Sequence, residues 1–331
     1  MIRQSPVSAI RRFSTQPTID RINQTIRLPD GRTLGFAEYG AHNGRPLIYF
    51  HGYPSSRIEA KPIDKYASRH GIRVLALDRP GYGLSSPQPE RTMLDWTKDV
   101  ESFADAMDIK KFAILGTSGG GPFAAACAYA LPRQRLTSVG LFASGPPWAA
   151  GKQYMTRTRR MACFLAHKAP FILKLILDGV LAFGRWLTSR TFVTKRIHTW
   201  LEAVNAKLAA DAKDASKPFE RDETPVAQQR EYLVDLILGE PFRQGTGAMT
   251  RETKLLSAQD WGFPLEDTTY PIQIWHGTKD VNAPIEAIRY LAEKMPNAKL
   301  TEFAQDTHYT MGTKMDQVVE ELMATDNSEL K

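Results

Sequence analysis

The stretch FAILGTSGGGPFAAACAY, residues 112–129, predicts a strand, a sharp turn and a helix in direct succession. Its first residues, Phe112 to Leu115, form an uninterrupted apolar run that is typical of a buried parallel strand. The alanine-rich segment from Phe123 to Leu131 follows Pro122, and proline is favoured in the first turn of a helix. A serine, Ser118, lies among the glycines that join the two elements.

The residues from Gly116 to Gly120 match the pattern G-x-S-x-G, in which a strained turn presents a nucleophilic serine. Gly116 and Gly120 have no Cβ, so the strand and the helix can approach each other closely. Gly119 leaves its backbone N–H open at the helix N-terminus, where the helix dipole favours negative charge. An ordinary Gly/Ser turn is the alternative, but the flanking strand and helix favour a nucleophile at Ser118.

The composition indicates a globular protein, because 42% of the 331 residues are hydrophobic and 24% are charged. This length suits one large domain with an insertion, or two domains. The two cysteines, Cys127 and Cys163, do not suggest a disulfide framework. No apolar run is long enough to predict a membrane-spanning helix. Motifs for metal ligation, phosphate loops and dinucleotide binding are also missing, so we expect no cofactor and no metal.

The first nineteen residues have the composition of a mitochondrial presequence. They contain Arg3, Arg11 and Arg12, several Ser, Thr and Gln residues, and no acid before Asp20. The sequence RRFS at residues 11–14 also resembles a presequence processing site. A basic N-terminal tail without that role is the alternative. We therefore predict a mitochondrial location, with the cytoplasm as the alternative.

Strands and helices alternate on both sides of a long helical region. The expected strands are 24–28, 33–39, 47–50, 73–77, 112–115, 136–143, 271–275 and 298–303. The helices expected between them are 59–70, 93–107, 123–131, 285–295 and 315–323. This alternation predicts an α/β fold with a mostly parallel, doubly wound sheet. The region between Gly145 and Gly262 shows no strand, and its expected helices are 154–167, 171–186, 192–213 and 226–238. We expect a core of residues 20–146 and 262–331 and an inserted helical cap of residues 147–261.

The expected cap is strongly basic. Between Gly151 and His198 there are ten Lys and Arg residues and one acid, Asp178, a difference of nine in a chain of net charge +7. Such a surface can attract an anionic substrate or an anionic membrane. The stretch from Phe164 to Leu187 is rich in Leu, Ile, Phe and Trp and suits a lipid interface or the roof of an apolar pocket. We expect a solvated basic face over a buried apolar one, ahead of peripheral membrane contact. No recognition motif supports nucleic-acid binding.

A serine hydroxyl needs a base within hydrogen-bond reach, and that base needs a partner that fixes its tautomer. Among seven histidines, His308 alone follows the last expected strand, at the sheet edge where Ser118 also lies. Asp280 follows the strand 271–275 and is the expected partner. Asp306 is the nearest rival, but its short separation from His308 places it poorly for the far side of the imidazole. Asp267 precedes that strand and so lies at the wrong edge.

The order Ser118, Asp280, His308 is that of the α/β-hydrolases, and the sequence resembles this superfamily outside the N-terminal tail and the cap. The resemblance rests on the G-x-S-x-G turn, His308 and three further segments: His51 to Pro54, Asp78 to Ser85 and His276 to Asp280. It implies an oxyanion hole made by the backbone N–H groups of Tyr53 and Gly119. His51 and Gly52 would support that loop. We expect His51 to shape its turn, and His276 to do the same in its own turn.

The segments His51 to Pro54 and Asp78 to Ser85 resemble the epoxide hydrolase, dehalogenase and haloperoxidase branch. Epoxide hydrolases and dehalogenases carry an aspartate at the position of Ser118. The serine of this sequence disfavours their alkyl-enzyme chemistry, so we expect an acyl-enzyme instead. The resulting hypothesis is a cofactor-free serine hydrolase of an ester, thioester or lactone. Its small-molecule acyl substrate would be fairly apolar and could carry an anionic group. Acyl transfer or carbon–carbon cleavage by the same residues, and a non-catalytic ligand-binding protein, are the alternatives.

Overall fold

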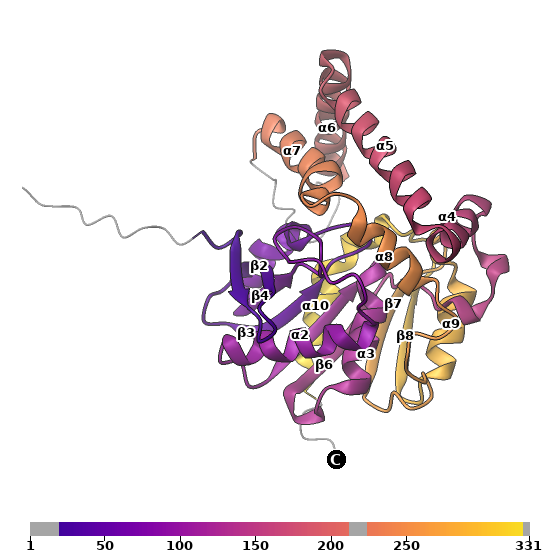
Figure 1. The fold of residues 1–331 in the computed structure, drawn as a ribbon. Coiled ribbons are helices and arrows are strands. Elements are labelled where there is room, and N and C mark those ends of the chain that lie inside the picture. Colours follow the sequence, from indigo (N-terminus) through magenta and orange to yellow (C-terminus); the bar gives the residue numbers. More distant parts are fainter. Residues whose placement is uncertain (1–19, 212–223, 327–331) are drawn as a thin grey trace, which may run out of the picture.

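The protein is described here by a computed structural model that covers residues 20–211 and 224–326 (Figure 1). The presequence prediction for residues 1–19 lies outside the described residues. Within them, no helix is both long and apolar enough to cross a membrane.

One eight-stranded sheet organises the chain, in the order β1-β2-β4-β3-β5-β6-β7-β8. The first hairpin, β1 with β2, is antiparallel, as is the pairing of β2 with β4, and all other neighbours are parallel. The doubly wound α/β architecture predicted from the sequence is confirmed. The strands are β1 Gln24–Arg27, β2 Thr33–Gly40, β3 Arg45–Phe50, β4 Ile72–Leu77, β5 Phe112–Thr117, β6 Leu136–Phe142, β7 Ile272–Gly277 and β8 Ala298–Phe303.

Helices pack on both faces of this sheet, because the central strands are apolar on both sides. Three helices share a core with one face: α2 Met93–Ala106, α3 Gly121–Ala130 and α9 Ile285–Lys294. Two cover the other: α1 Asp64–Arg69 and α10 Met315–Ala324. Fully buried side chains such as Trp96 and Trp275 fill the two layers.

The expected helix at 59–70 differs from the structure. Arg57–Ile63 is a 3₁₀ segment with Pro62 inside it, and the α-helical hydrogen bonds start only at Asp64. Proline has no N–H to donate and restricts the residue before it, so the longer helix could not form there.

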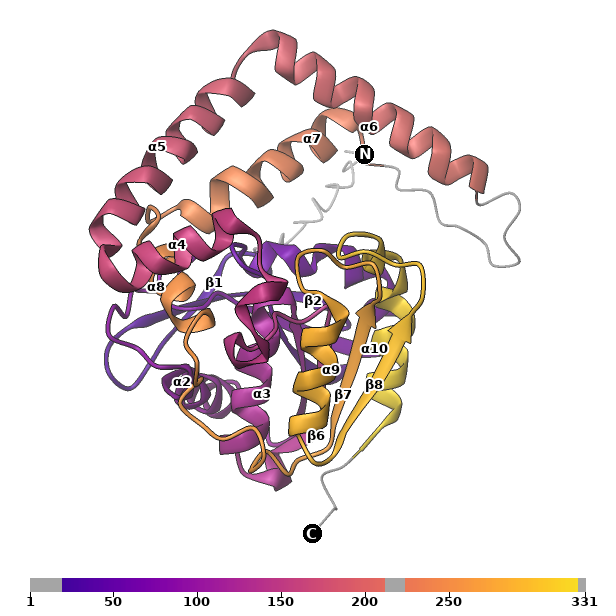
Figure 2. The ribbon, with the colours of Figure 1, turned by 90° about the vertical axis from the view of Figure 1, so that its right-hand side faces the viewer.

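The segment between β6 and β7 folds into helices above the carboxyl edge of the sheet (Figures 1 and 2). They are α4 Arg157–Lys168, α5 Pro170–Thr188, α6 Thr191–Asp211, α7 Val226–Val234 and α8 Gly247–Leu256. The first four lie where helices were expected, with α7 ending in a π turn at Asp235–Gly239. Helix α8 was not predicted. Its buried face carries Thr250, Glu252 and Thr253, so it lacks the apolar periodicity that reveals an amphipathic helix.

The expectation that the apolar face of the cap is buried is wrong for α5. Phe171 and Phe183 are 76% and 61% exposed, and Trp186 is half-exposed. The opposite face of the same helix carries the buried Leu173 and Leu181. Most of the circumference of α5 is therefore apolar, and the described residues cover only one side of the helix.

A buried ion cluster fastens α8 to the core. Glu252 is fully buried and accepts hydrogen bonds from Arg79 (Nε, 2.7 Å; Nη2, 3.0 Å) and from Arg91 (Nη2, 2.8 Å). Arg79 and Arg91 lie in the segment between β4 and α2, so the Glu252 carboxylate joins α8 to this segment. Arg79 also supports the loop after β3.

Replacing Glu252 with glutamine is expected to destabilise the protein by about 3–5 kcal/mol, because it removes the charge that compensates two buried guanidinium groups. Urea unfolding at neutral pH measures this change. Glu302→Gln is the matched control, since Glu302 pairs with Arg289 at the exposed surface and its loss should cost less than about 1 kcal/mol. A change for Glu252→Gln no larger than the control would contradict the anchoring role.

Candidate active site

The turn after β5 carries Ser118 in a left-handed conformation, with φ of +50°. This is uncommon for a residue with a side chain and gives the sharp bend expected between strand and helix. A Cβ on Gly116 would lie 2.5 Å from the Gly120 carbonyl oxygen, and one on Gly120 would lie 2.3 Å from that of Phe50. Both glycines are therefore required by close backbone contact, as the sequence predicted.

The structure brings Ser118, His308 and Asp280 together at the carboxyl edge of the sheet. They follow β5, β8 and β7, which end at the same edge because these strands are parallel. The Ser118 hydroxyl lies 3.0 Å from His308 Nε2, and His308 Nδ1 lies 2.6 Å from Asp280 Oδ2. With Nδ1–H donating to the carboxylate, Nε2 is the acceptor for the serine proton.

Asp280 is buried, and its second oxygen accepts hydrogen bonds from the backbone N–H groups of Asn282 and Ala283, both at 2.8 Å. Burial raises the pKa of Asp280, but its interactions with His276 and His308 outweigh burial and hold the pKa below its usual value. His276 Nε2 lies 3.3 Å from Asp280 Oδ2. His276 therefore contacts the carboxylate as well as shaping its turn, which the sequence did not reveal.

Within residues 20–211 and 224–326, no hydrogen bond joins the rival carboxylate, Asp306, to His308. Its Oδ1 accepts a hydrogen bond from the hydroxyl of Thr310 at 2.9 Å, and its backbone oxygen accepts one from Lys279. The geometry therefore places Asp280, and not Asp306, against the imidazole.

The lowered pKa of Asp280 predicts a pH-dependent stability. A carboxyl whose pKa is lower in the folded state contributes stability above its unfolded pKa, near 3.9, and loses it as the pH falls further. The difference in unfolding free energy between wild type and Asp280→Asn should therefore shrink as the pH is lowered from 5 to 3. Urea unfolding at several pH values measures it, and a difference that grows on acidification would contradict the lowered pKa.

The backbone of Tyr53 lies against Gly119, as an oxyanion hole requires. A Cβ on Gly119 would stand 2.4 Å from the Cβ of Tyr53 and 3.1 Å from its backbone nitrogen. Among residues 20–211 and 224–326, no protein acceptor takes the Tyr53 N–H. The two backbone N–H groups of the predicted oxyanion hole therefore belong to residues in close contact.

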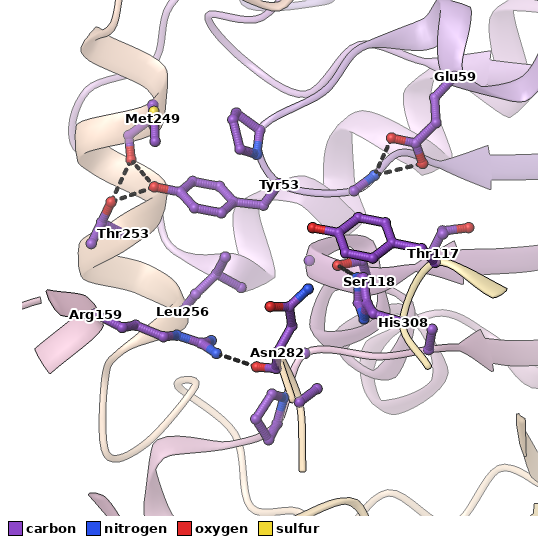
Figure 3. A pocket seen from close by; sticks show the side chains of 18 of the residues that line it. Tyr53, Glu59, Thr117, Ser118, Arg159, Met249, Thr253, Leu256, Asn282 and His308 are labelled. Carbon is purple, nitrogen blue, oxygen red and sulfur yellow. Dashed lines mark hydrogen bonds between the residues drawn. The ribbon is translucent and has the colours of Figure 1, made fainter. Parts of the chain in front are cut away.

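Three side chains hold the loop after β3 that carries Tyr53. His51 is fully buried and accepts the Arg79 N–H at Nε2 (3.2 Å), and burial lowers the pKa of His51 well below its usual value, so its ring stays neutral. Arg79 also donates to the Gly52 oxygen at 2.9 Å. Glu59 accepts the Gly52 N–H at 2.9 and 3.0 Å and the Tyr49 hydroxyl at 2.8 Å (Figure 3).

Neither Glu59 nor Arg79 had a role in the sequence analysis. Arg79 belongs to the Asp78 to Ser85 segment, but a sequence motif does not show that its side chain folds back onto the preceding loop. Glu59 was expected only as the first residue of the helix 59–70. Glu59 can accept the Gly52 N–H only because the 3₁₀ segment turns its side chain toward the loop.

Replacing Glu59 with alanine is expected to lower kcat by up to about 10²-fold with little change in KM, because a misplaced oxyanion loop weakens binding of the transition state more than of the ground state. Glu59→Gln keeps one acceptor oxygen and should recover part of the loss. Steady-state kinetics on one chromogenic ester compares the variants. An unchanged kcat for Glu59→Ala would show that the loop holds its position without this carboxylate.

Ser118 and His308 open onto a cavity of about 850 Å³ between the sheet edge and the cap (Figure 3). Its walls are mainly apolar, with Trp148, Leu173, Leu177, Met249, Leu256 and Val281 among them. Tyr53 spans the cavity wall, and its hydroxyl donates to the Met249 oxygen of α8 at 3.1 Å. Arg159 of α4 brings a positive charge to the wall and donates to the Asn282 oxygen at 2.6 Å.

The described residues contain no cluster of three or more His, Cys, Asp or Glu side chains placed to hold a metal ion. Both cysteines are buried and free.

The strand order and the serine at the turn after β5 define a class of α/β proteins in which a sharp turn between a strand and a helix carries a serine. A family model described as "alpha/beta hydrolase fold" matches residues 45–314. The chain belongs to the α/β-hydrolase family, as its motifs indicated.

Known relatives of the family share part of this sequence. The chain is 31% identical to a non-heme chloroperoxidase of Streptomyces lividans over 125 residues, 37% of this chain and 45% of the relative. It is 28% identical to a proline iminopeptidase of Xylella fastidiosa over 113 residues, 33% of this chain and 36% of the relative. The matches thus span less than half the length of these relatives.

Solved structures share the fold over nearly the whole length. An esterase from Exiguobacterium antarcticum matches with a TM-score of 0.61 and 17% identity over 92% of this chain and 98% of its own. The enol-lactonase from Burkholderia xenovorans matches with a TM-score of 0.60 and 18% identity over 91% of this chain and 100% of its own. At these identities the likeness shows the fold alone.

Proposed function

We propose that this protein is a serine hydrolase that cleaves a carboxylic ester, thioester or lactone through an acyl-enzyme, without a cofactor. The observation that carries the proposal is the unbroken chain of hydrogen bonds from Asp280 through His308 to Ser118, of which His308 and Ser118 line the cavity. This arrangement supplies a nucleophile, a base and an orienting carboxylate in reach of one bound substrate.

In the proposed reaction the Ser118 oxygen attacks the acyl carbonyl carbon while His308 Nε2 takes the hydroxyl proton. The backbone N–H groups of Tyr53 and Gly119 hold the oxyanion. The bond to the leaving group then breaks, and His308 returns the proton to it. A water molecule then gives a proton to His308 and attacks the acyl carbon. The bond from that carbon to the Ser118 oxygen breaks, the acid is released, and His308 returns the proton to Ser118. Asp280 keeps the imidazole oriented and stabilises its positive charge throughout.

The cavity supports a fairly apolar substrate. Its aliphatic and aromatic walls favour a hydrocarbon acyl or alcohol group, and Arg159 in the wall can pair with a carboxylate or another anionic group of the substrate. Two structural neighbours, an esterase and an enol-lactonase, are named for acyl chemistry, whereas the chloroperoxidase relative is named for a different reaction.

Hydrolysis of p-nitrophenyl esters with graded acyl chains tests the proposal. We expect turnover that depends on Ser118 and a higher kcat/KM for medium chains than for acetate, because the cavity buries more hydrocarbon. Adding an alcohol or amine acceptor and analysing the products separates hydrolysis from acyl transfer. Tight binding of these esters with no product would favour a non-catalytic binding protein and contradict the proposal.

We further propose import into mitochondria, which rests only on the composition of residues 1–19. Sequencing the N-terminus of the mature protein tests it. A start near Ser14 would support import, and an intact Met1 in a cytoplasmic fraction would contradict it.

A further inference from the structure

The outer face of α5 is an exposed apolar surface. Seven large apolar side chains of this helix are each between 48% and 76% exposed. They include two adjacent pairs, and the other steps are three or four residues, so all seven lie on one half of the helix. We name them the apolar stripe: Phe171, Ile172, Leu175, Ile176, Val180, Phe183 and Trp186. Phe192 and Trp200 of α6 are also more than half exposed. An apolar surface of this extent marks an interaction site more often than a solvated face.

The stripe lies on a projecting part of the molecule. Figures 1 and 2 both show α5 and α6 extending from the cap and meeting at an apex that points away from the sheet. At the end of α5, Phe183 stacks on Trp186 with ring centroids 5.7 Å apart, and the guanidinium of Arg190 lies 4.4 Å from the Trp186 ring centre. Aromatic rings beside a cation are typical of side chains at a membrane–water interface.

The segment that carries the stripe is strongly basic, although Lys174 pairs with Asp178 and Arg185 donates to the backbone oxygens of Leu238 and Phe242. From Phe164 to Trp200 the chain carries one acid, Asp178, which already bonds Lys174 and Thr246. The Lys and Arg residues of the same segment are Lys168, Lys174, Arg185, Arg190, Lys195 and Arg196. A second copy of this chain on the stripe would bring like charges together. An anionic lipid surface would neutralise them and bury the apolar side chains at the same time.

We propose that the apolar stripe and the start of α6 bind the surface of an anionic lipid bilayer, with α5 lying in the interface and not crossing the membrane. The opposite face of α5 carries Leu173 and Leu177, which line the cavity. Docking therefore places the roof of the cavity next to the lipid. In this position the cavity could take up apolar substrates from the bilayer. Such uptake rests on the proposed hydrolysis, whereas the binding of the protein to the membrane does not.

Vesicle sedimentation of the full chain tests the binding, with phosphatidylcholine vesicles and with vesicles that also contain phosphatidylglycerol. We expect the protein to sediment with the anionic vesicles at least 10-fold more strongly, and less strongly at high salt. The double variants Phe183→Ser with Trp186→Ser and Lys195→Glu with Arg196→Glu should each weaken binding by about 10-fold or more. Ile237→Ser is the control, because Ile237 is 54% exposed on the cap but lies outside the stripe.

The altered residues are exposed, so thermal melting of each variant should match wild type. Ser118→Ala should bind vesicles like wild type, which separates failure of docking from failure of the proposed hydrolysis. The proposal would be overturned if the wild-type protein bound neither kind of vesicle, or if both double variants bound the anionic vesicles as strongly as wild type. It would also fall if Phe183→Ser with Trp186→Ser abolished a dimer in solution while vesicles bound neither form, since a second copy would then cover the stripe.

Discussion

Replacing Ser118 with alanine is expected to lower kcat/KM for a p-nitrophenyl ester by about 10⁴–10⁶-fold. The hydroxyl is the atom that would form the acyl-enzyme, and it already lies 3.0 Å from the base that would take its proton. Without it, the N–H groups of Tyr53 and Gly119 could still polarise a bound carbonyl, so a small residual rate above water should remain. Steady-state kinetics on purified variants measures the loss.

Ser257→Ala is the matched control for this prediction. Ser257 lines the same cavity and bonds the Thr253 carbonyl of α8, but no hydrogen bond joins it to His308 among the described residues. Its removal should change kcat/KM by less than about 10-fold. Equal losses in the two variants would show that the reaction does not pass through Ser118.

Asp280→Asn is expected to lower kcat by about 10⁴-fold while KM stays close to wild type. An asparagine amide can donate a hydrogen bond to Nδ1, which would leave the proton on Nε2, where the Ser118 hydroxyl needs an acceptor. It also removes the negative charge that stabilises the imidazolium formed during attack. The measurement is the rate at saturating ester.

Asp306→Asn provides the comparison, since Asp306 is the nearest carboxylate in sequence to His308 and bonds Thr310 instead. This variant should keep most of the activity. A large loss in Asp306→Asn combined with an active Asp280→Asn would reverse the assignment of the acid.

The sequence predicted those features that depend on local pattern. The run from Phe112 to Leu115, the glycines around Ser118 and the alternation of strands with helices were enough to predict the parallel sheet and the turn. The three side chains of the candidate site could be selected because parallel strands end at one edge, so that residues following β5, β7 and β8 must lie near one another.

The features that the sequence did not predict depend on contacts between distant segments. Glu252 is buried only because Arg79 and Arg91 meet it, so the helix that carries it showed no apolar face. Glu59 supports the Tyr53 loop through a turn that Pro62 shapes. The exposed side of α5 was also not predicted, because a helix that is apolar over most of its circumference does not show which of its faces the fold covers.

Covalent labelling with a fluorophosphonate probe measures the reactivity of the Ser118 hydroxyl itself, because this reagent reacts with a serine hydroxyl only when a neighbouring base activates it. We predict that intact-mass spectrometry shows one probe per chain, that the modified peptide contains Ser118, and that labelling is lost in Ser118→Ala and strongly slowed in Asp280→Asn. Labelling that persists in Ser118→Ala, or an esterase-active protein whose Ser118 never reacts, would contradict the account.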